Sequence, residues 1–589
     1  MKLKRRILIA LLAALMLLSC LTGCAKQDTK EDAPAQADHA SPDGDQQTLP
    51  AEGEAMTEFD VGEKYWSGKS EDVYTLDLLC DDAPVDCSTQ TTIGKYIYDK
   101  FGIVFNYVGF SGDIQQQQAM MLAGSDYNEL MYMQTNTIAK QYMDAGVLLN
   151  LDDYKDILPD FYSMWEQSIP YWRSVSADGK LYKWDCRVPQ QGEYFDMMVR
   201  SDVLEYYGWP TLVSTSDWLD FLEQALADFP TTFDGQATVG MAIPMAESWG
   251  LAGLTPTMYE KGDTYLPVSN DWFTYNAKTE EFEEMVYVDD VKDSYKFFNE
   301  AYQRGILDEE CFTDTCDNLQ QKMNNGSAIA VFYVTWLTGA ANQTLADAGH
   351  EEMSYIHMPI QSDAQVAAGQ GHERVLSYTY DFQSWAVTDK CKDPERLLTF
   401  INWCSTDEAQ LLFNSGLEGV HYTLDENGVR QPTEALIEAA KAGELSTKEG
   451  LFRGGATVFR GMPLKTGSWT DGKKLNLCDT TEFTTAVEGE TRTSYSYEQL
   501  GWDSDTAWWD ENAAWVEAGH SDTFLDPASD LGQIGAKMTD IRVKYSGQLI
   551  VSEDFDSVWA QMMDEYELLD HAAVLDALNA QLAALKAAD

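Results

Sequence analysis

Residues 385–428 read WAVTDKCKDPERLLTFINWCSTDEAQLLFNSGLEGVHYTLDENG, a stretch that predicts a strand, two helices and a turn. The short apolar strand ends near Val387. Asp393 can then cap a helix whose first position is Pro394, where the missing N–H costs nothing. Apolar residues recur at helical spacing along the first helix: Leu397, Phe400, Ile401 and Cys404.

The second helix of this stretch carries its own start and stop signals. Ser405 and Glu408 are spaced as a capping box. Gly416 stands where a left-handed C-cap would end the helix. The Asp-Glu-Asn-Gly run at 425–428 is typical of a turn. These signals define local elements and leave the function open.

Strands alternate with helices in the N-terminal third of the chain. The pattern predicts strands at 73–79, 103–108 and 129–133, with helices at 91–101 and 113–122 between them. Such alternation favours an α/β fold with a mostly parallel sheet. Ligands of these sheets bind at the carboxyl ends of the strands. Tyr132 and Gln134, at the end of the third predicted strand, are therefore candidate ligand-binding residues.

Length and charge limit the classes of function. The chain of 589 residues exceeds one hydrophobic core and predicts two or more domains. It has 97 acidic and 40 basic residues, a net charge of −57, which would repel nucleic-acid phosphates. The same charge argues against a strongly anionic ligand, although a solvated acidic surface would explain it equally. The 17 Trp and 30 Tyr suit a protein that grips sugar rings.

The start of the chain predicts a secretory signal. Basic residues at positions 2–6 precede an apolar run, Ile7 to Leu18, that is too short to span a bilayer. Leu-Thr-Gly-Cys at 21–24 matches a bacterial lipobox, so Cys24 would carry the lipid that anchors the mature protein. A poorer second candidate ends at Cys20, and an ordinary signal peptide that contains Cys is the alternative.

Eight further cysteines follow Cys24. Export permits disulfides. The pairs close in sequence are the candidates: Cys80/Cys87, Cys311/Cys316 and Cys391/Cys404. Connectivity does not follow from sequence, and buried free thiols fit equally.

Catalytic signatures are missing from the sequence. There is no nucleophile elbow, phosphate-binding loop, dinucleotide fingerprint or H-E-x-x-H. The seven histidines show no metal-ligand spacing. With so many carboxylates, an Asp/Glu pair is no evidence for glycoside hydrolysis. We therefore expect no enzyme activity, no cofactor and no catalytic metal.

Aromatic residues in loops are the remaining site candidates. Trp336 follows a predicted strand at 326–333, while Trp249, Tyr380 and Trp469 lie in loops flanked by Gly or polar residues. Each could instead pack in a core. His421 is interpreted as a structural residue.

Several runs resemble one family. These are CKDPER, FINWCSTDEAQ and GLEGVHY within 391–422, MLAGSDYNELM at 121–131, MVRSDVLEYYGWP at 198–210 and NGSAIAVFYVTW at 325–336. In this order behind a lipobox, they resemble extracellular solute-binding lipoproteins of bacterial ABC importers (family 1, LplA-like oligosaccharide-binding subgroup).

The resemblance implies a periplasmic-binding-protein-like fold: two α/β lobes, a hinge and a central cleft. Trp336 resembles the family's cleft tryptophan. An oligosaccharide would be trapped by hinge closure and passed to the transmembrane subunits of an ABC permease. The receptor would be a monomer, lipid-anchored at the extracellular face of the cell membrane. A receptor for peptides or another polar solute, or a surface glycan hydrolase or adhesin, are the alternatives.

The expected domain order combines these observations. Residues 24–70 are acidic and poor in large apolar side chains, which predicts a disordered tether. The predicted parts are a signal peptide at 1–23, the tether at 24–70, lobe 1 at 71–187 plus about 383–430, lobe 2 at 188–382 plus about 431–550, and a C-terminal helical segment at 551–589.

Overall fold

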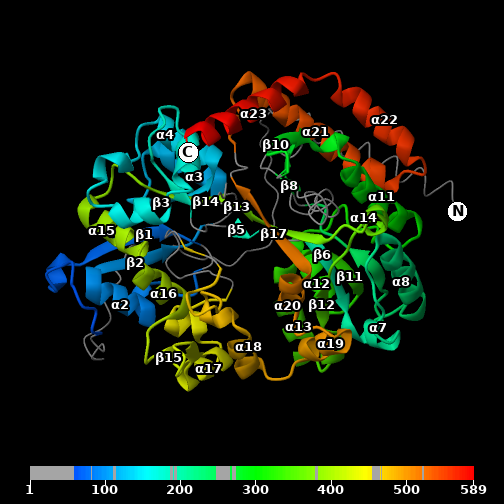
Figure 1. The fold of residues 1–589 in the computed structure, drawn as a ribbon, viewed down its shortest axis with the longest axis horizontal. Helices are drawn as coiled ribbons and strands as arrows, with labels where there is room; N and C mark the ends of the chain where they lie inside the picture. The colour runs from blue at the N-terminus through cyan, green and yellow to red at the C-terminus, as the bar shows by residue number, and fades with distance from the viewer. Residues whose placement is uncertain are drawn as a thin grey trace, which may run out of the picture. The chain divides into compact units, whose positions relative to one another are not determined.

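The computed structural model describes most of the chain beyond residue 58 (Figure 1). The described residues are 59–80, 83–110, 114–185, 190–191, 195–246, 265–267, 273–276, 278–377, 382–453, 464–465, 467–519 and 523–588. Contacts divide the chain into Met1–Thr57 and Glu58–Asp589, and the elements below belong to the second unit. The predicted signal segment and Cys24 lie outside the described residues.

The first core is the cluster of buried residues that includes Leu76, Phe101 and Trp385. Two small sheets contribute to it: β1 pairs with β2 in parallel, and β14 lies between β3 and β4 with both pairings antiparallel. The elements of this part are β1 (Tyr74–Leu79), α2 (Thr92–Phe101), β2 (Ile103–Val108), α3 (Ile114–Gly124), β3 (Leu130–Thr135), α4 (Asn136–Asp144), α5 (Pro159–Met164), α6 (Ile169–Ser174), β4 (Trp184–Asp185), β14 (Phe382–Val387), α15 (Pro394–Cys404), α16 (Asp407–Ser415), β15 (Tyr422–Leu424), β16 (Arg430–Pro432), α17 (Glu434–Lys441) and α18 (Thr481–Glu488).

The second core is the cluster that includes Met198, Phe298 and Val331. It is built on the sheet β12-β6-β11-β7, whose strand β11 is buried at every residue. The elements of this part are β6 (Phe195–Arg200), α7 (Ser201–Tyr206), α8 (Thr215–Asp228), β7 (Val239–Ala242), β8 (Tyr265–Pro267), β9 (Phe273–Asn276), β10 (Glu281–Glu284), α11 (Asp289–Gln303), α12 (Cys316–Asn324), β11 (Ala328–Val334), α13 (Thr338–Asp347), β12 (Tyr355–Met358), α14 (Asp363–Ala368), α19 (Arg492–Leu500), α21 (Asp530–Val551), α22 (Phe555–Tyr566) and α23 (His571–Ala588).

The sheets are mixed, which corrects the expectation of a mostly parallel sheet. The pairs β1–β2 and β7–β11 are parallel. However, β6 runs antiparallel to both of its neighbours, and so does β14. These two strands bring the chain into each part from the other one. They are therefore not products of the strand–helix–strand repeat that orients parallel neighbours.

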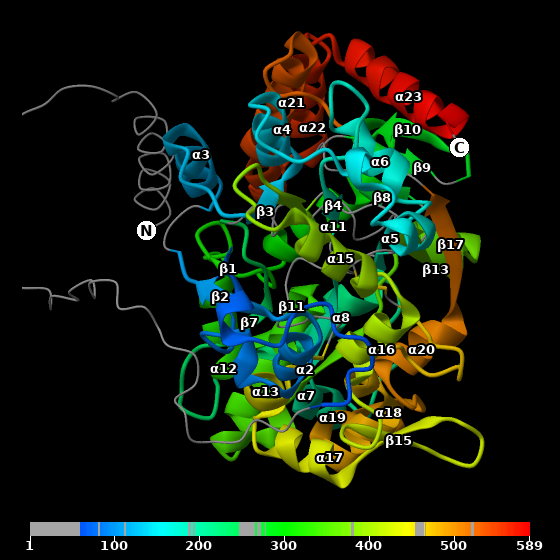
Figure 2. The same ribbon diagram turned by 90° about the vertical axis from the view of Figure 1, so that its left-hand side faces the viewer.

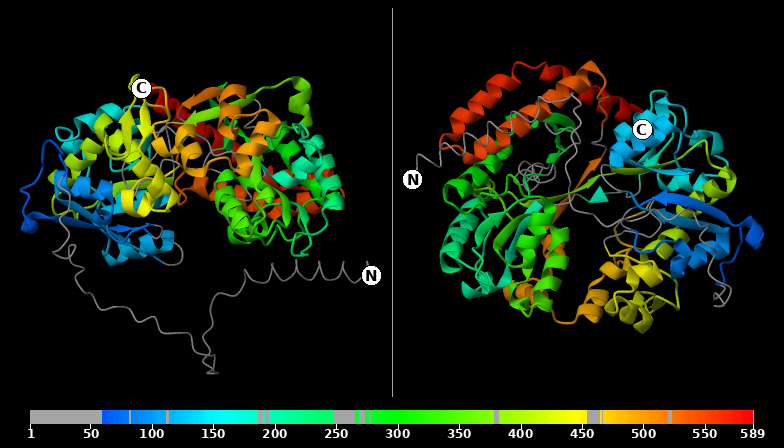
Figure 3. Two further views of the ribbon diagram at one scale, coloured as in Figure 1. Left: turned by 90° about the horizontal axis from the view of Figure 1, so that it is seen from below. Right: turned by 180° about the vertical axis from the view of Figure 1, so that it is seen from behind.

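A third sheet, here the crossover sheet, has the order β17-β13-β5 (Figures 1 and 3). Its strands are β5 (Gln190–Gln191), β13 (His372–Ser377) and β17 (Ala513–Gly519). In sequence, β5 stands between β4 and β6, and β13 between β12 and β14. Two strands of the crossover sheet, β5 and β13, thus come from segments in which the chain passes between the two cores, while β17 lies between α19 and α21 of the second part.

Helix α2 shows how local signals and packing agree. The Thr91 side chain caps it by accepting from the Gly94 N–H at 3.0 Å, and Gly102 ends it with a φ of 64°. A Cβ at Gly102 would lie 2.4 Å from the Trp66 ring. The Trp66 indole in turn donates to the Asp99 carbonyl, and Val61 is buried in the first core. The last part of the predicted tether, residues 59–70, therefore packs on the fold instead of remaining a linker.

The stretch at 385–428 folds largely as its caps predict. Asp393 accepts from the Arg396 N–H, and Pro394 opens α15. The predicted capping box is wrong, because Thr406 caps α16 by accepting from the Ala409 N–H. Ser405 ends α15 instead, and its hydroxyl accepts the buried Trp165 indole N–H at 2.9 Å. His421 is structural: its Nδ1 accepts the Leu417 N–H at 2.8 Å.

The predicted domain boundaries also need correction after β15. Leu436, Leu464 and Phe483 are buried in the first core, although residues 431–550 had been predicted for the second lobe. The second core takes over with Tyr497 on α19 and continues to Leu582 on α23. The hairpin β15–β16 turns the chain back, and Arg430 of β16 donates to the Ser415 hydroxyl at the end of α16, which holds this segment in the first part.

The described cysteines show no sign of the candidate pairings. Cys87, Cys311 and Cys391 are free thiols, so none of the three candidate pairs forms a disulfide. Burial raises the pKa of the Cys391 thiol, and this keeps the reactive thiolate scarce.

In the described part of the chain, no helix is both long and apolar enough to cross a bilayer, and this includes α21 with its 22 residues.

The predicted C-terminal helical segment consists of α22 and α23, coloured orange-red and red in Figure 2. A buried carboxylate ties them to the second core. Glu284, which ends β10, accepts the Tyr566 hydroxyl at 2.8 Å and contacts His571 Nδ1 at 2.9 Å. Burial alone would lower the pKa of His571, but the carboxylates of Glu284 and Glu567 raise it above its ordinary 6.5.

Replacing His571 with alanine is expected to lower the free energy of unfolding by about 1.5 kcal/mol at pH 6. A histidine whose folded-state pKa is raised adds stability that is complete below its unfolded pKa and lost as the pH rises through the folded pKa. The difference between the wild type and His571→Ala should therefore shrink between pH 6 and pH 9 in urea denaturation. The control is His350→Ala, which removes a surface ion pair with Glu352. A pH-independent difference would contradict this account.

Candidate functional site

The end of β3 brings Tyr132 and Gln134 together. The Tyr132 hydroxyl donates to the Gln134 Oε1 atom. The Tyr132 ring lies 5.5 Å from the buried Trp385 ring on the neighbouring strand β14, where the two residues are directly paired. Both Tyr132 and Gln134 are half-buried. Trp385 thus fixes the ring of Tyr132, and Gln134 takes up its hydroxyl.

A buried glutamine on α3 holds this strand end in place, and sequence reasoning missed it. Gln118 is fully buried, and its Nε2 donates to the Tyr132 carbonyl at 2.7 Å while its Oε1 accepts the Gln134 N–H at 3.3 Å. One turn earlier, Gln115 accepts the Thr135 hydroxyl at 3.3 Å. The available signal was the run of four glutamines at 115–118, in which the first and last share a helix face.

The second candidate position is the end of β11. Trp336 lies in the 3-10 turn Thr335–Leu337, directly after this buried strand and before α13. The Thr338 hydroxyl donates to the Thr335 carbonyl at 2.8 Å and contacts His357 Nε2 at 3.1 Å. The backbone N–H of His357 donates to the Tyr497 hydroxyl at 2.9 Å. The turn that carries Trp336 is thereby fixed to β12 and α19.

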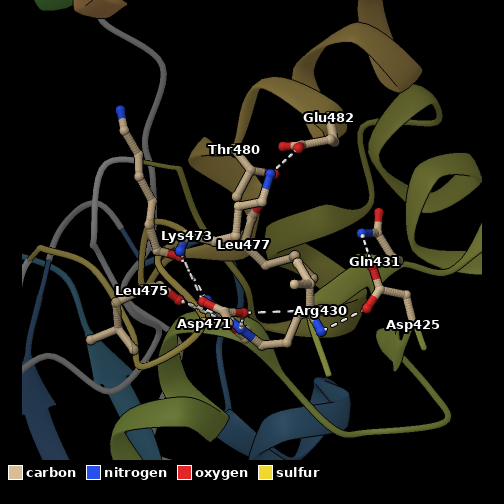
Figure 4. Close-up of polar contacts among 12 residues, drawn as sticks. Asp425, Arg430, Gln431, Asp471, Lys473, Leu475, Leu477, Thr480 and Glu482 are labelled. Carbon is tan, nitrogen blue, oxygen red and sulfur yellow. Dashed lines mark hydrogen bonds and ion pairs between the residues drawn. The ribbon is translucent and has the colours of Figure 1, made fainter. Parts of the chain in front are cut away.

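Trp469 lies on a tight turn in which its N–H donates to the Lys473 carbonyl at 2.7 Å. Arg430 holds this turn from β16: its Nε lies 2.9 Å from Asp471 Oδ2, and both side chains are buried (Figure 4). Arg430 also donates to the carbonyls of Lys474 and Leu475, each at 2.9 Å. Burial alone would raise the pKa of Asp471, but Arg430 and the Lys473 N–H hold it below its ordinary value. The turn is a rigid, buried-charge structure.

The remaining site predictions, Trp249 and Tyr380, lie outside the described residues and stay predictions. In the described part of the chain, no group of three or more His, Cys, Asp or Glu side chains could hold a metal ion. The described candidates thus stand at two strand ends, Tyr132 with Gln134 and the Trp336 turn, and on the separate turn of Trp469. Their chemistry consists of rings and neutral hydrogen-bonding groups, which suit the binding of a polar, uncharged molecule.

Comparison with known proteins gives one family match. A family model described as bacterial extracellular solute-binding protein matches residues 95–417, more than half of the chain. No curated protein matches the chain.

Solved structures resemble the fold over nearly their whole length. The alginate-binding protein AlgQ2 without calcium ion has a TM-score of 0.54 and 13% identity, covering 89% of this chain and 99% of its own. An HMO-binding, ABC-transporter-associated solute-binding protein from Bifidobacterium longum infantis has a TM-score of 0.54 and 16% identity, and the match covers 87% of this chain and 98% of that protein. The ABC-transporter substrate-binding protein FusA of S. pneumoniae, an EF-hand mutant in complex with fructo-nystose, has a TM-score of 0.57 and 14% identity. This match covers 87% of this chain and 100% of that protein. These likenesses confirm the predicted periplasmic-binding-protein-like fold.

Proposed function

Because the chain belongs to the bacterial extracellular solute-binding proteins, we propose that it is the solute receptor of an ABC importer and that its solute is an oligosaccharide. The observation that carries this proposal is the family match, which covers both cores. The three solved relatives support the sugar, since their names refer to alginate, HMO and fructo-nystose. At 13–16% sequence identity, these relatives support the class of solute, and a binding experiment identifies the individual sugar.

Capture would proceed by closure of two lobes around the solute. The crossover sheet supports this part of the proposal, because its strands β5 and β13 stand in the segments that connect the two cores. Small backbone rotations in such connections let two rigid parts approach each other. A solute that contacts both parts only in the closed form shifts the population toward that form. Binding and release need no covalent step, so we propose a receptor and not an enzyme.

The proposed contacts are those predicted from the sequence. Tyr132 and Gln134 would offer a ring, a hydroxyl and an amide from the end of β3. Trp336 would stack from the end of β11, with Trp249, Tyr380 and Trp469 as further ring contacts. Rings pack on the apolar C–H faces of sugars, and amide and hydroxyl groups bond the sugar hydroxyls.

The cellular setting belongs to the same proposal. Cys24 would carry the lipid anchor at the extracellular face of the cell membrane, and residues after it would act as a tether. The closed receptor, a monomer of the LplA-like subgroup, would dock on the transmembrane subunits of its permease and release the solute there. The net charge of −57 favours a solute that is not strongly anionic.

Isothermal titration calorimetry tests the proposal. The mature chain with Cys24→Ser is titrated with neutral oligosaccharides: kestose, nystose, maltotriose, cellotriose, xylotriose, mannotriose and lacto-N-tetraose. We expect one saturable binder with a Kd in the micromolar range or tighter, about −8 kcal/mol or better, and recovery of the intact sugar afterwards.

Two other outcomes would redirect the proposal. Binding of a peptide, with no sugar bound, would identify a receptor for another polar solute on the same fold. Release of shortened sugars, or binding only to insoluble glycan, would identify a hydrolase or adhesin. Chromatography of the solution after each titration separates these cases.

A further inference from the structure

A group of aromatic rings lies where α20 (Asp505–Asn512) runs directly into strand β17 of the crossover sheet. Its members are Tyr497, Trp502, Trp508, Trp509 and His372, the first residue of β13. The Trp502 ring stacks on Tyr497 at 5.9 Å and lies 5.1 Å from Trp508. Trp508 in turn meets Trp509 at 5.2 Å and His372 at 5.0 Å. The sequence pattern gave no reason to expect these rings to meet.

Two of these tryptophans differ from the structural tryptophans of the fold. Trp502 and Trp508 are half-buried, and Trp508 is a member of none of the buried clusters formed by the described residues. Several structural tryptophans have paired indoles, although the buried Trp403 of the first core does not. The N–H groups of Trp66, Trp165 and Trp172 donate to Asp99, Ser405 and Asp185 at 2.7–3.0 Å.

The indole N–H groups of Trp502 and Trp508 have no such acceptor. Within the described part of the chain, neither donates a hydrogen bond, and neither is among the buried unpaired polar atoms. Both indole nitrogens therefore retain some exposure on half-buried rings. A partly exposed ring with an unused donor is the combination that binds a sugar, whose C–H face covers the ring while a hydroxyl accepts the N–H.

The position of the group fits the same use. The Tyr497 hydroxyl oxygen accepts the His357 backbone N–H at 2.9 Å. The His357 ring in turn contacts the Thr338 hydroxyl of the Trp336 turn at 3.1 Å. The aromatic group is therefore linked through His357 to the end of β11. Helix α20 also packs against both β12 and β17 (Figure 1). It stands where the crossover sheet meets the second core.

We propose that Trp502 and Trp508 form a stacking subsite for one neutral sugar ring of the transported solute. This inference rests on the proposed function and adds a specific part of the site to it. Asp503, next to Trp502 in sequence, and Glu511, three residues after Trp508 on α20, are exposed carboxylates. They would repel a uronate, so we expect the subsite to select uncharged rings. A sugar bound here also touches the elements that connect the two cores.

The test uses the mature chain with Cys24→Ser and the same oligosaccharide panel. Trp508→Ala is expected to weaken binding of the sugar that the wild type binds by roughly 5- to 150-fold, as for other aromatic stacking. Trp508→Phe, which keeps a ring but loses the N–H, should lose less. The matched control is Trp209→Ala, a half-buried tryptophan covered by Arg492 at 5.7 Å, and it should bind as the wild type does.

A second measurement does not depend on the stability of any variant. The chain is labelled with ¹⁵N at the indole nitrogens, and the signals of Trp502 and Trp508 are identified with the variants Trp502→Phe and Trp508→Phe. Addition of the bound sugar should shift both signals and leave the signal of Trp165 in place. Unshifted signals together with an unchanged Kd in Trp508→Phe would overturn the subsite and leave the transport receptor intact. Failure of every panel sugar to bind the wild type would overturn both proposals.

Discussion

Replacing Arg430 with methionine is expected to lower the free energy of unfolding by about 3–5 kcal/mol. The methionine keeps most of the apolar volume but leaves the Asp471 carboxylate buried without its partner. It also leaves the carbonyls of Lys474 and Leu475 without the donors that Arg430 supplies. Urea denaturation followed by circular dichroism measures the change. Arg304→Met, which removes an exposed pair with Asp220 and Glu223, is the control and should cost less than about 1 kcal/mol.

Two further measurements separate charge burial from loss of packing. The double variant Arg430→Met with Asp471→Leu removes the orphaned carboxylate, so it should be more stable than Arg430→Met alone. In the wild type, the lowered pKa of Asp471 adds stability above its unfolded value of 3.8, and this stability is lost as the pH falls through the folded value. The cost of Arg430→Met should therefore shrink below pH 4. Equal stability of the single and double variants would refute the role of the buried charge.

Replacing Trp336 with alanine is expected to weaken oligosaccharide binding by about 1–3 kcal/mol, the usual value of an aromatic ring stacked on a flat ligand. The backbone of the turn that carries Trp336 is fixed by Thr338 and His357, so the substitution should leave the turn in place. Calorimetry with the sugar found in the panel measures the loss.

Trp336→Phe keeps a smaller ring and should give an intermediate Kd, while Trp209→Ala again serves as the control. A folded Trp336→Ala variant that binds with the wild-type Kd would remove Trp336 from the site.

Local signals predicted the elements that depend on neighbours in sequence. Asp393 and Pro394 opened α15, and Gly102 ended α2, because caps and positive φ angles are properties of a few adjacent residues. The capping box at Ser405 failed for a tertiary reason, since the hydroxyl of Ser405 is taken by the indole of Trp165.

Long-range partnerships could not be predicted from the sequence. The helix and turn patterns after residue 431 say nothing about which core they join; tertiary contacts such as those of Ser415 with Arg430 and Leu475 hold them in the first part. Nothing in the sequence pairs Gln118 with β3, yet its buried amide bonds the open backbone groups of Tyr132 and Gln134. Trp502 and Trp508 likewise become a group only when α20 packs beside β13, the strand that begins with His372.

The passage of the chain between the cores also sets the order in which they can be completed. Val61 and Phe483 are buried in the first core, and Met197 and Leu582 in the second. A chain delivered from its N-terminus thus cannot close the first core until α18 has appeared, nor the second until its last helix has. Contacts so distant in sequence are slow to form. The first core can therefore be completed only after Glu488 has appeared and the second only with the last helix, so the apolar surfaces of both need protection from aggregation during most of synthesis or translocation.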